Sequence, residues 1–442
     1  MKFSIFNFQF PINFQFSITT ILNFLVKLFL FILPWQTIWI YQESFFGDYK
    51  NQFGTLGFYV SEILLWLIVL LFIILYWKQR KFSISNKFSI FRDRIFVFSV
   101  FLFIIYCLAS AFWAFDFSIA WQQALRIMEM FLLFFILSFG LLSKKEIARW
   151  IILGSVIPIF LGLFQFIFQF TFSNKYLGLT IQPIWEAGSS VVVGEFGRLL
   201  RAYGSFAHPN IFAGYLVIVF LVSILFFGKK EKSTLISYFF IGLLMLTLFF
   251  TFSRAALLTI FFLILGFLIY SFINKNKIIN QIAIFSLVLF FVLLFSLGSV
   301  FQSRILVESV NEIQSIQERV GSVSQALNIW SENFWFGVGA GNYIFALHNL
   351  NPNFAGWLYQ PVHNVCLLML AELGLVGILL FIFLIITFFV FLSSRLSKKD
   401  FFWLIYAIFC LIILLFLDHY LWSFYIGLLL NSLFFSLILV KK

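Results

Sequence analysis

Five arginines of this chain occupy linkers that are poor in lysine. They are Arg198, Arg201, Arg254, Arg304 and Arg319. The lysine-rich linkers alternate along the chain with the linkers that contain these arginines, and all four histidines fall on the side of the arginines. Lys and Arg are normally enriched in the cytoplasmic loops of membrane proteins. Arginines that face the other way need a functional reason, and binding of an anionic, lipid-linked substrate is a good one because guanidinium groups bind phosphate in a bidentate manner.

Two motifs place arginines beside the membrane. Arg201 and His208 lie in RAYGSFAHPN, directly before an apolar run, where Pro209 suits the first turn of a helix. A helix cap explains His208 as well as chemistry does. Arg254 lies in TFSRAALL, between two apolar runs. An arginine so close to hydrocarbon is costly unless it is paired or faces a wet cavity, which makes Arg254 a candidate for anion binding. The alternative is a side chain that extends to the membrane interface.

The other titratable candidates lie towards the C-terminus. His363, in QPVHNV, stands at the start of a long apolar run, where the helix dipole disfavours imidazolium and leaves a neutral general base. Glu372 lies inside that run, and Asp418 lies in the turn LDHY. Such carboxylates need partners, and we expect the arginines or His363 to supply them, with Asp418 orienting His363 or an arginine. For Glu372, a helix-packing hydrogen bond is the alternative.

Arg319 belongs to an amphipathic segment. Apolar residues recur at helical steps from Leu306 through Val320, Val323 and Leu327 to Trp330, with Glu and Gln between them. We therefore expect an amphipathic helix that lies along the membrane surface or caps a cavity. On this pattern alone, Arg319 is an ordinary solvated arginine.

Composition defines the elements that must position these residues. The chain has 442 residues, of which 63% are hydrophobic, and 70 are Phe. Runs of about 20 apolar residues, long enough to cross a bilayer, recur throughout. The sequence predicts an all-α polytopic membrane protein, residues 1–442 forming one membrane domain with both termini in the cytoplasm. The predicted spans are 17–41, 56–77, 95–115, 119–142, 150–172, 209–227, 233–250, 254–273, 278–298, 362–392, 401–417 and 420–440. Two long linkers, 173–208 and 299–361, are expected on the external face.

Several function classes are excluded by what the linkers contain. The net charge of +12 comes mostly from short linkers that we place in the cytoplasm, so it indicates topology rather than nucleic-acid binding. The three cysteines are far apart, and no P-loop or DxD pair occurs. We therefore expect chemistry at the external face without a cofactor, without ATP and without a metal.

Taken in order, these motifs resemble those of the O-antigen ligase/O-antigen polymerase superfamily. The likeness runs over about 200–380, through RAYGSFAHPN, TFSRAALL, ERVGSVSQALNIWSENFWFGVGAGNY, PVHN and ELGLVG, and includes the external loop 299–361. It implies a glycosyltransferase of the GT-C type that uses a polyprenyl-diphosphate-linked glycan, such as an undecaprenyl-diphosphate one, as donor. It also implies diphosphate binding by Arg254 and Arg319, with Arg201 as a third ligand. His363 would act on the acceptor hydroxyl, supported by Asp418.

The resemblance leaves three functions open. A ligase would move the glycan to a lipid, glycan or protein acceptor during polysaccharide biosynthesis for the cell envelope, whereas a polymerase would join two lipid-linked repeats. A transporter or flippase of an anionic lipid or solute also explains internal arginines, but it predicts inverted repeats that we do not find. The expected location is the cytoplasmic (inner) membrane, with the active site outside. The sequence does not specify the sugar, the linkage or the oligomeric state.

Overall fold

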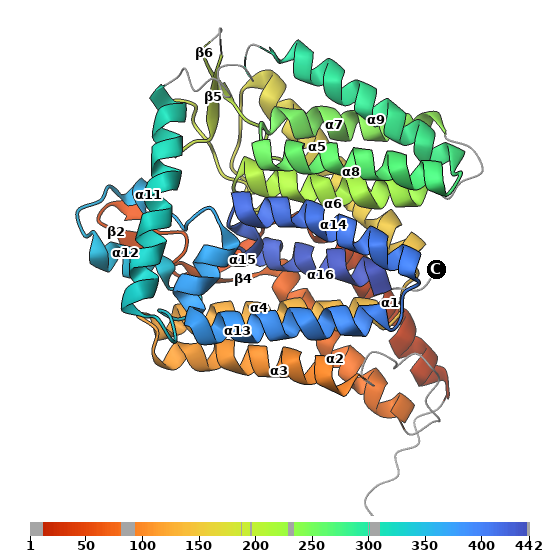
Figure 1. Cartoon of the computed structure of the whole chain (residues 1–442), viewed down its shortest axis with the longest axis horizontal. Helices are drawn as coiled ribbons and strands as arrows, with labels where there is room; N and C mark the ends of the chain where they lie inside the picture. The colour runs from red at the N-terminus through yellow and green to blue at the C-terminus, as the bar shows by residue number, and fades with distance from the viewer. Residues whose placement is uncertain are drawn as a thin grey trace, which may run out of the picture.

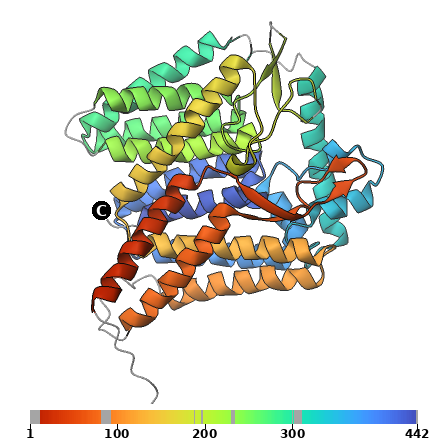
Figure 2. The same cartoon turned by 180° about the vertical axis from the view of Figure 1, so that it is seen from behind.

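The computed structural model describes residues 12–80, 93–186, 188–194, 197–228, 234–298, 300 and 310–439. Arg304 lies outside these ranges. Within these ranges, twelve long apolar helices form a bundle, in which most run horizontally in Figure 1, while α1, α2 and α5 lie obliquely to them in the view from behind (Figure 2). They are α1 (Ile12–Ile32), α2 (Val60–Arg80), α3 (Arg94–Ala109), α4 (Phe117–Ser138), α5 (Lys144–Phe168), α6 (Pro209–Phe227), α7 (Leu235–Phe250), α8 (Arg254–Ile273), α9 (Lys277–Ser296), α13 (Val365–Ser393), α14 (Lys398–Leu417) and α16 (Tyr425–Leu439).

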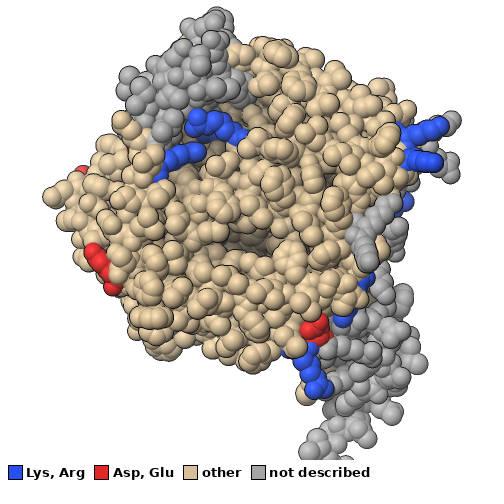
Figure 3. All heavy atoms as spheres, viewed as in Figure 1, with Lys and Arg blue, Asp and Glu red and all other residues tan. Residues whose placement is uncertain are grey.

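The length of these helices fits a membrane. Within the described ranges, eight of them are long and apolar enough to cross a bilayer, and four contain shorter apolar stretches. On the face shown in Figure 3, a broad uncharged surface with a hollow near its centre separates charged side chains that gather towards the edges. The prediction of an all-α polytopic membrane protein is confirmed. Helix α6 is the most enclosed of the long spans and forms the centre of the bundle.

Short elements gather at one end of the bundle, on the left in Figure 1. They are β1 (Ile38–Gln42), β2 (Phe45–Phe46), β3 (Tyr49–Lys50), β4 (Leu56–Tyr59), β5 (Val191–Gly194), β6 (Gly197–Leu200), α11 (Val310–Glu332), α12 (Tyr343–Leu350) and α15 (Tyr420–Ser423), with the 3-10 turns Ser110–Phe112, Lys175–Leu177 and Gly356–Leu358. The strands form three antiparallel pairs, β1 with β4, β2 with β3, and β5 with β6. This end of the bundle is called the loop end below.

Three predicted spans differ from the structure. The first was expected over 17–41, but α1 ends at Ile32, and 38–42 pairs as strand β1 with β4. Pro34 follows the helix and cannot donate a hydrogen bond to continue it. The second was expected over 56–77, but Leu56–Tyr59 form strand β4 and α2 begins at Val60. The last span was expected over 420–440, but Phe424 is extended (φ −113°, ψ 141°) and separates α15 from α16.

Helix α11 forms over the described part of the predicted amphipathic segment and crosses the loop end (Figure 1). The apolar side chains of the pattern do not all face the bundle. Val320 is 68% exposed and Leu327 41%, whereas Ala326 and Ile329 are each 1% exposed. The small side chain of Ala326 permits close packing against the bundle. An outward apolar stripe is compatible with a helix at the membrane interface, where apolar side chains are not confined to the protein core.

Helix α13 is interrupted at Gly374, whose φ of +65° and ψ of −171° are not helical. The glycine-rich turn before α12 fills the break, because the N–H groups of Val338 and Gly339 donate to the carbonyls of Ala371 and Glu372 at 3.0 and 2.8 Å. Backbone groups inside a membrane must be satisfied within the protein. The motifs FGVGAG and ELGLVG are therefore explained as two halves of one backbone junction.

Candidate functional site

Four linkers meet at the loop end through a chain of hydrogen bonds. Arg201, which follows β6 and is 6% exposed, donates from Nε to the carbonyl of Thr251 and from a terminal nitrogen to Oδ1 of Asn210, both at 2.6 Å. Nδ2 of Asn210 then donates to Oδ2 of Asp418 at 2.7 Å. His363 is in contact with the same carboxylate: its Nδ1 lies 3.6 Å from Oδ1 of Asp418. Residues far apart in sequence are thus held in one network.

Asp418 is an ionised carboxylate at the centre of this network. Burial opposes its ionisation, but the contact with His363 and the electrostatic influence of His419 and His208 outweigh it, and the pKa of Asp418 lies well below its usual range. Its Oδ1 also accepts the N–H of His419 at 2.8 Å. Asp418 follows the last residue of α14 and has an extended backbone conformation.

The three nearby histidines differ in what their ring nitrogens do. His208 caps α6: its Nδ1 accepts the N–H of Asn210 at 3.1 Å, and its Nε2 lies 2.8 Å from Oγ of Ser190. His419 binds Oγ of Ser423 through Nδ1 at 2.7 Å. Burial lowers the pKa of both His208 and His419 to about 3, so both are neutral. His363 retains 25% exposure of its side chain and faces the Asp418 carboxylate.

The predicted arginines divide by burial. Arg254 is half-buried as the first residue of α8, and follows Phe252, whose φ of +48° ends α7 in a left-handed turn. Arg319, on α11, is also half-buried and lies close enough to disfavour imidazolium at His419. Arg198 is exposed on β6. Arg201 is therefore built into the protein, whereas Arg254 and Arg319 keep accessible surface at the loop end.

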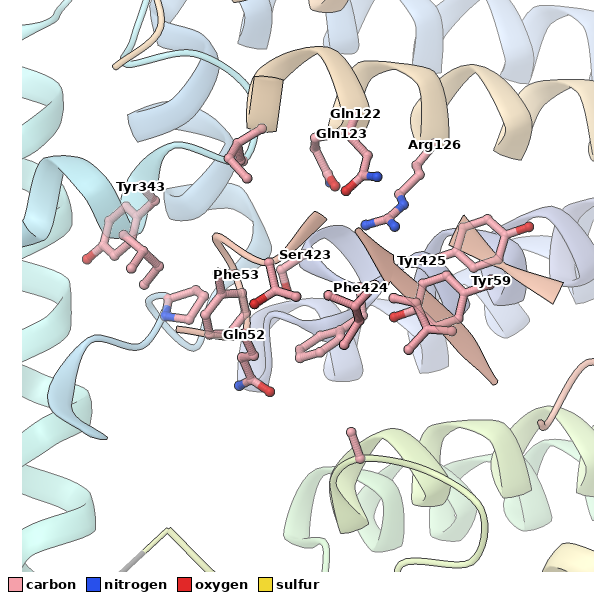
Figure 4. A pocket seen from close by; sticks show the side chains of 18 of the residues that line it. Gln52, Phe53, Tyr59, Gln122, Gln123, Arg126, Tyr343, Ser423, Phe424 and Tyr425 are labelled. Carbon is pink, nitrogen blue, oxygen red and sulfur yellow. The ribbon is translucent and has the colours of Figure 1, made fainter. Parts of the chain in front are cut away.

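Glu372 has a different partner from the one expected. Its Oε2 accepts a 2.7 Å hydrogen bond from Nε1 of Trp422, and the backbone N–H groups of Gly341 and Tyr343 also bind it. The carboxylate is 3% exposed and lines a separate cavity at the loop end (Figure 4). The expectation that an arginine or His363 would pair with Glu372 is wrong, because the glycine-rich turn that leads into α12 directs N–H groups towards it.

Sequence reasoning missed three residues of the site and its surroundings. Asn210 connects Arg201 to Asp418, and His419 packs its ring edge-on to His363 with centroids 5.1 Å apart. Both lie beside residues that were singled out, in HPN and LDHY. Arg126, on α4, lines the same cavity as Glu372. It lies in the first 150 residues, to which no role had been given.

The cluster of His363, Asp418 and His419 has side-chain atoms of the types that bind metal ions. The ligand atoms of His363, Asp418 and His419 lie within 4.8 Å of one another. However, Asp418 already accepts hydrogen bonds on both oxygens, and one nitrogen of His419 is held by Ser423. The hydrogen-bonded contacts of Asp418 and His419 thus occupy much of the donor set, and Nδ1 of His363 faces the Asp418 carboxylate at 3.6 Å.

Comparison with known proteins gives one match. Residues 238–382 match a family model described as O-antigen ligase. The matched region begins in α7 and ends in α13, so it includes Arg254, Arg319, His363 and Glu372. No curated protein matches the chain. The family match supports the resemblance found in the motifs: residues 238–382 of this membrane protein are similar to the O-antigen ligase family.

Proposed function

We propose that the protein transfers a glycan from a polyprenyl-diphosphate carrier to an acceptor hydroxyl, as an O-antigen ligase-like glycosyltransferase. The loop end would face the outside of the cytoplasmic membrane, with both termini in the cytoplasm. The observation that carries the proposal is the network from Arg201 through Asn210 and Asp418 to His363, formed at the end of a membrane bundle and beside two accessible arginines. The family match supports glycan transfer of the ligase or polymerase type.

The leaving group sets the electrostatic requirement. Breaking the bond between the sugar and the carrier releases a diphosphate, on which negative charge develops. Of the three arginines in the motifs shared with the superfamily, Arg254 and Arg319 keep accessible surface, and their planar guanidinium groups suit phosphate oxygens. Preorganised donors of this kind are each worth on the order of 2–4 kcal/mol of barrier. We assign Arg201 chiefly to positioning, because its donors already bind Thr251 and Asn210.

His363 would act as the general base. Nδ1 of the imidazole faces Asp418 at 3.6 Å, and Nε2 would accept the proton of the acceptor hydroxyl as that oxygen attacks the anomeric carbon. The proton then resides on His363, where the ionised Asp418 stabilises the imidazolium, and the electron pair of the broken bond leaves with the diphosphate. In-line attack by the hydroxyl inverts the configuration of the transferred sugar. General-base catalysis typically contributes about 10²–10⁴-fold.

Reconstitution of the purified protein with a polyprenyl-diphosphate glycan tests the proposal. His363→Ala should abolish transfer while donor binding persists, with His348→Phe as the matched control because His348 stacks on Phe46 away from the network. Arg254→Ala and Arg319→Ala should weaken donor binding, and the exposed Arg198→Ala should not. Unchanged transfer by the His363 variant would remove the base assignment.

The same assay separates the two activities of the superfamily. Longer glycan chains made without any added acceptor would indicate a polymerase. Transfer only to an added lipid, glycan or protein acceptor would indicate the ligase that we propose. Movement of intact lipid-linked glycan across the vesicle membrane, with no transfer, would instead support a transporter.

A further inference from the structure

A cavity of about 200 Å³ lies at the loop end, separate from the diphosphate-binding arginines. The segment 38–59 forms one wall, α4 another, and α15 with the start of α16 a third (Figure 4). In Figure 4, Gln122, Gln123 and Arg126 project from α4 towards the aromatic side chains opposite. Sites for drug-sized ligands typically measure about 300–1,000 Å³, so this cavity suits a group the size of a single ring.

The cavity adjoins His363 through one side chain, His419. The ring of His419 packs edge-on to His363 on one side. Its other neighbours, Phe53 and Phe424 with ring centroids at 6.0 and 6.1 Å and Ser423 bound to Nδ1, all line the cavity. The imidazole of His419 therefore lies between a group bound in the cavity and His363, the proposed base. Arg201 and Asn210 are connected to Asp418 by hydrogen bonds, from Arg201 to Asn210 and from Asn210 to Asp418.

The charges of the cavity are already compensated. A terminal nitrogen of Arg126 donates to the carbonyl of Gly57 at 2.8 Å and lies 3.8 Å from Oε2 of Glu62. Lys50 is paired with Glu43. The third charged lining residue, Glu372, is the acid bound by Trp422. With both cations paired, the cavity has no surplus positive charge for a second phosphate, and an uncharged ligand fits it better.

The remaining lining is a mixture of aromatic faces and amides. Tyr59 and Tyr425 stack on each other with centroids 5.0 Å apart, and Phe53 and Phe424 lie beside them. The Nε2 groups of Gln122 and Gln123 donate hydrogen bonds to backbone carbonyls, which fixes the orientation of the two amides at the cavity wall. The exposed Gln52 lies at the edge of the cavity. Aromatic faces suit the C–H surface of a sugar ring, and amides suit its hydroxyls.

We propose that this cavity is a subsite for one uncharged sugar ring of a reacting glycan, next to the hydroxyl from which His363 takes the proton. The proposal rests on the proposed function. The ring belongs either to the acceptor or to the donor glycan, and the kinetic test distinguishes the two.

Kinetics with the full-length protein in nanodiscs test the subsite. The substrates are the lipid-linked glycan and the acceptor fraction isolated from the cells that make the protein. Gln52→Ala and Phe53→Leu should raise one KM by about three- to ten-fold, the loss expected for one hydrogen bond or ring contact, with kcat nearly unchanged. Gln42→Ala, an exposed glutamine of β1 outside the cavity, is the matched control. A change in acceptor KM places an acceptor sugar in the cavity, and a change in donor KM places a donor sugar there. If neither KM moves beyond the control, the proposal is wrong.

A binding measurement separates failure of the subsite from failure of the proposed function. Saturation-transfer NMR with methyl glycosides of the sugars in the cell-surface polysaccharide should detect binding that Phe53→Leu reduces and Gln42→Ala does not. Such binding without any transfer activity would keep the sugar subsite and remove the proposed reaction. Saturable binding of inorganic pyrophosphate at this cavity, lost in Phe53→Leu, would overturn the assignment to an uncharged ring.

Discussion

The Asp418→Asn substitution tests the relay most directly. The side chain keeps its shape and loses its charge. Asp418 faces three donors, Nδ2 of Asn210, the N–H of His419 and Nδ1 of His363. An asparagine has one acceptor oxygen and a donating amide, so at least one donor would face another donor. The substitution therefore removes both the electrostatic partner of the imidazolium and the orientation of the ring.

The expected size of the effect follows from the distance between the two groups. Unit charges at the 3.6 Å that separates Nδ1 of His363 from Oδ1 of Asp418 attract by about 4.6 kcal/mol at an effective dielectric constant of about 20. If half of the charge has developed on His363 in the transition state, about 2.3 kcal/mol is lost, or about 50-fold in rate. Complete proton transfer would raise the loss to about 2,000-fold.

The assay is the initial rate of glycan transfer in nanodiscs, with kcat and donor KM measured separately. We expect kcat to fall within this range and donor KM to stay nearly constant. Asp116→Asn is the control, because Asp116 caps α4 through Oδ1 and asparagine caps a helix equally well. A kcat within about five-fold of the wild type, in a protein with an unchanged unfolding temperature, would refute the role given to Asp418.

Three further predictions concern the framework of the site. Because folding lowers the pKa of both His208 and His419 from 6.5 to about 3, the unfolded chain binds their protons first. The free energy of unfolding should fall as pH drops from about 6.5 towards 3, and His208→Asn, which preserves the helix cap, should make thermal denaturation less sensitive to pH in that window. Gly374→Ala should lower the unfolding temperature strongly, since φ is +65° and a Cβ would lie 2.5 Å from backbone atoms, whereas Gly242→Ala on α7, with nothing nearer than 4.0 Å, should not. Arg201→Lys should reduce thermal stability and kcat more than donor affinity, as measured by unfolding and donor titration, because an ammonium lacks the fork that holds two acceptors.

The helices of this fold were predictable, and the reason is physical. Apolar runs of about 20 residues have no stable alternative in a bilayer, because every backbone group must be bonded within the segment. The short strands were not predictable in the same way. Strand β1 follows α1 after a few residues and is itself apolar, so 38–42 extends the hydropathy of the helix without being helical. The pairing of β1 with β4 is tertiary information that no local pattern carries.

The face of α11 shows a second limit of periodic patterns. A stripe of apolar residues predicts burial only when the alternative is water. Helix α11 crosses the loop end of a membrane bundle, and there the side chains of Val320 and Leu327 are exposed while Ala326 packs inward. At an interface, close approach of a small residue competes with burial of large apolar ones. The helix was predictable from the sequence, but its orientation was not.

The site was predictable as a set of residues but not as a network, and the difference lies in the polar connectors. Placing an arginine or a histidine beside hydrocarbon costs free energy, so such residues are rare there and can be recognised as candidates in the sequence. Asn210 carries no charge and gives no such signal, yet it accepts from Arg201 and donates to Asp418 at the same time. A neutral amide can do both, whereas a carboxylate or a guanidinium can do only one. Asn210 therefore separates the guanidinium of Arg201 from the carboxylate of Asp418 while connecting the two by hydrogen bonds. In the proposed mechanism, Arg201 fixes the position of Asp418 in this way and leaves its negative charge available to His363.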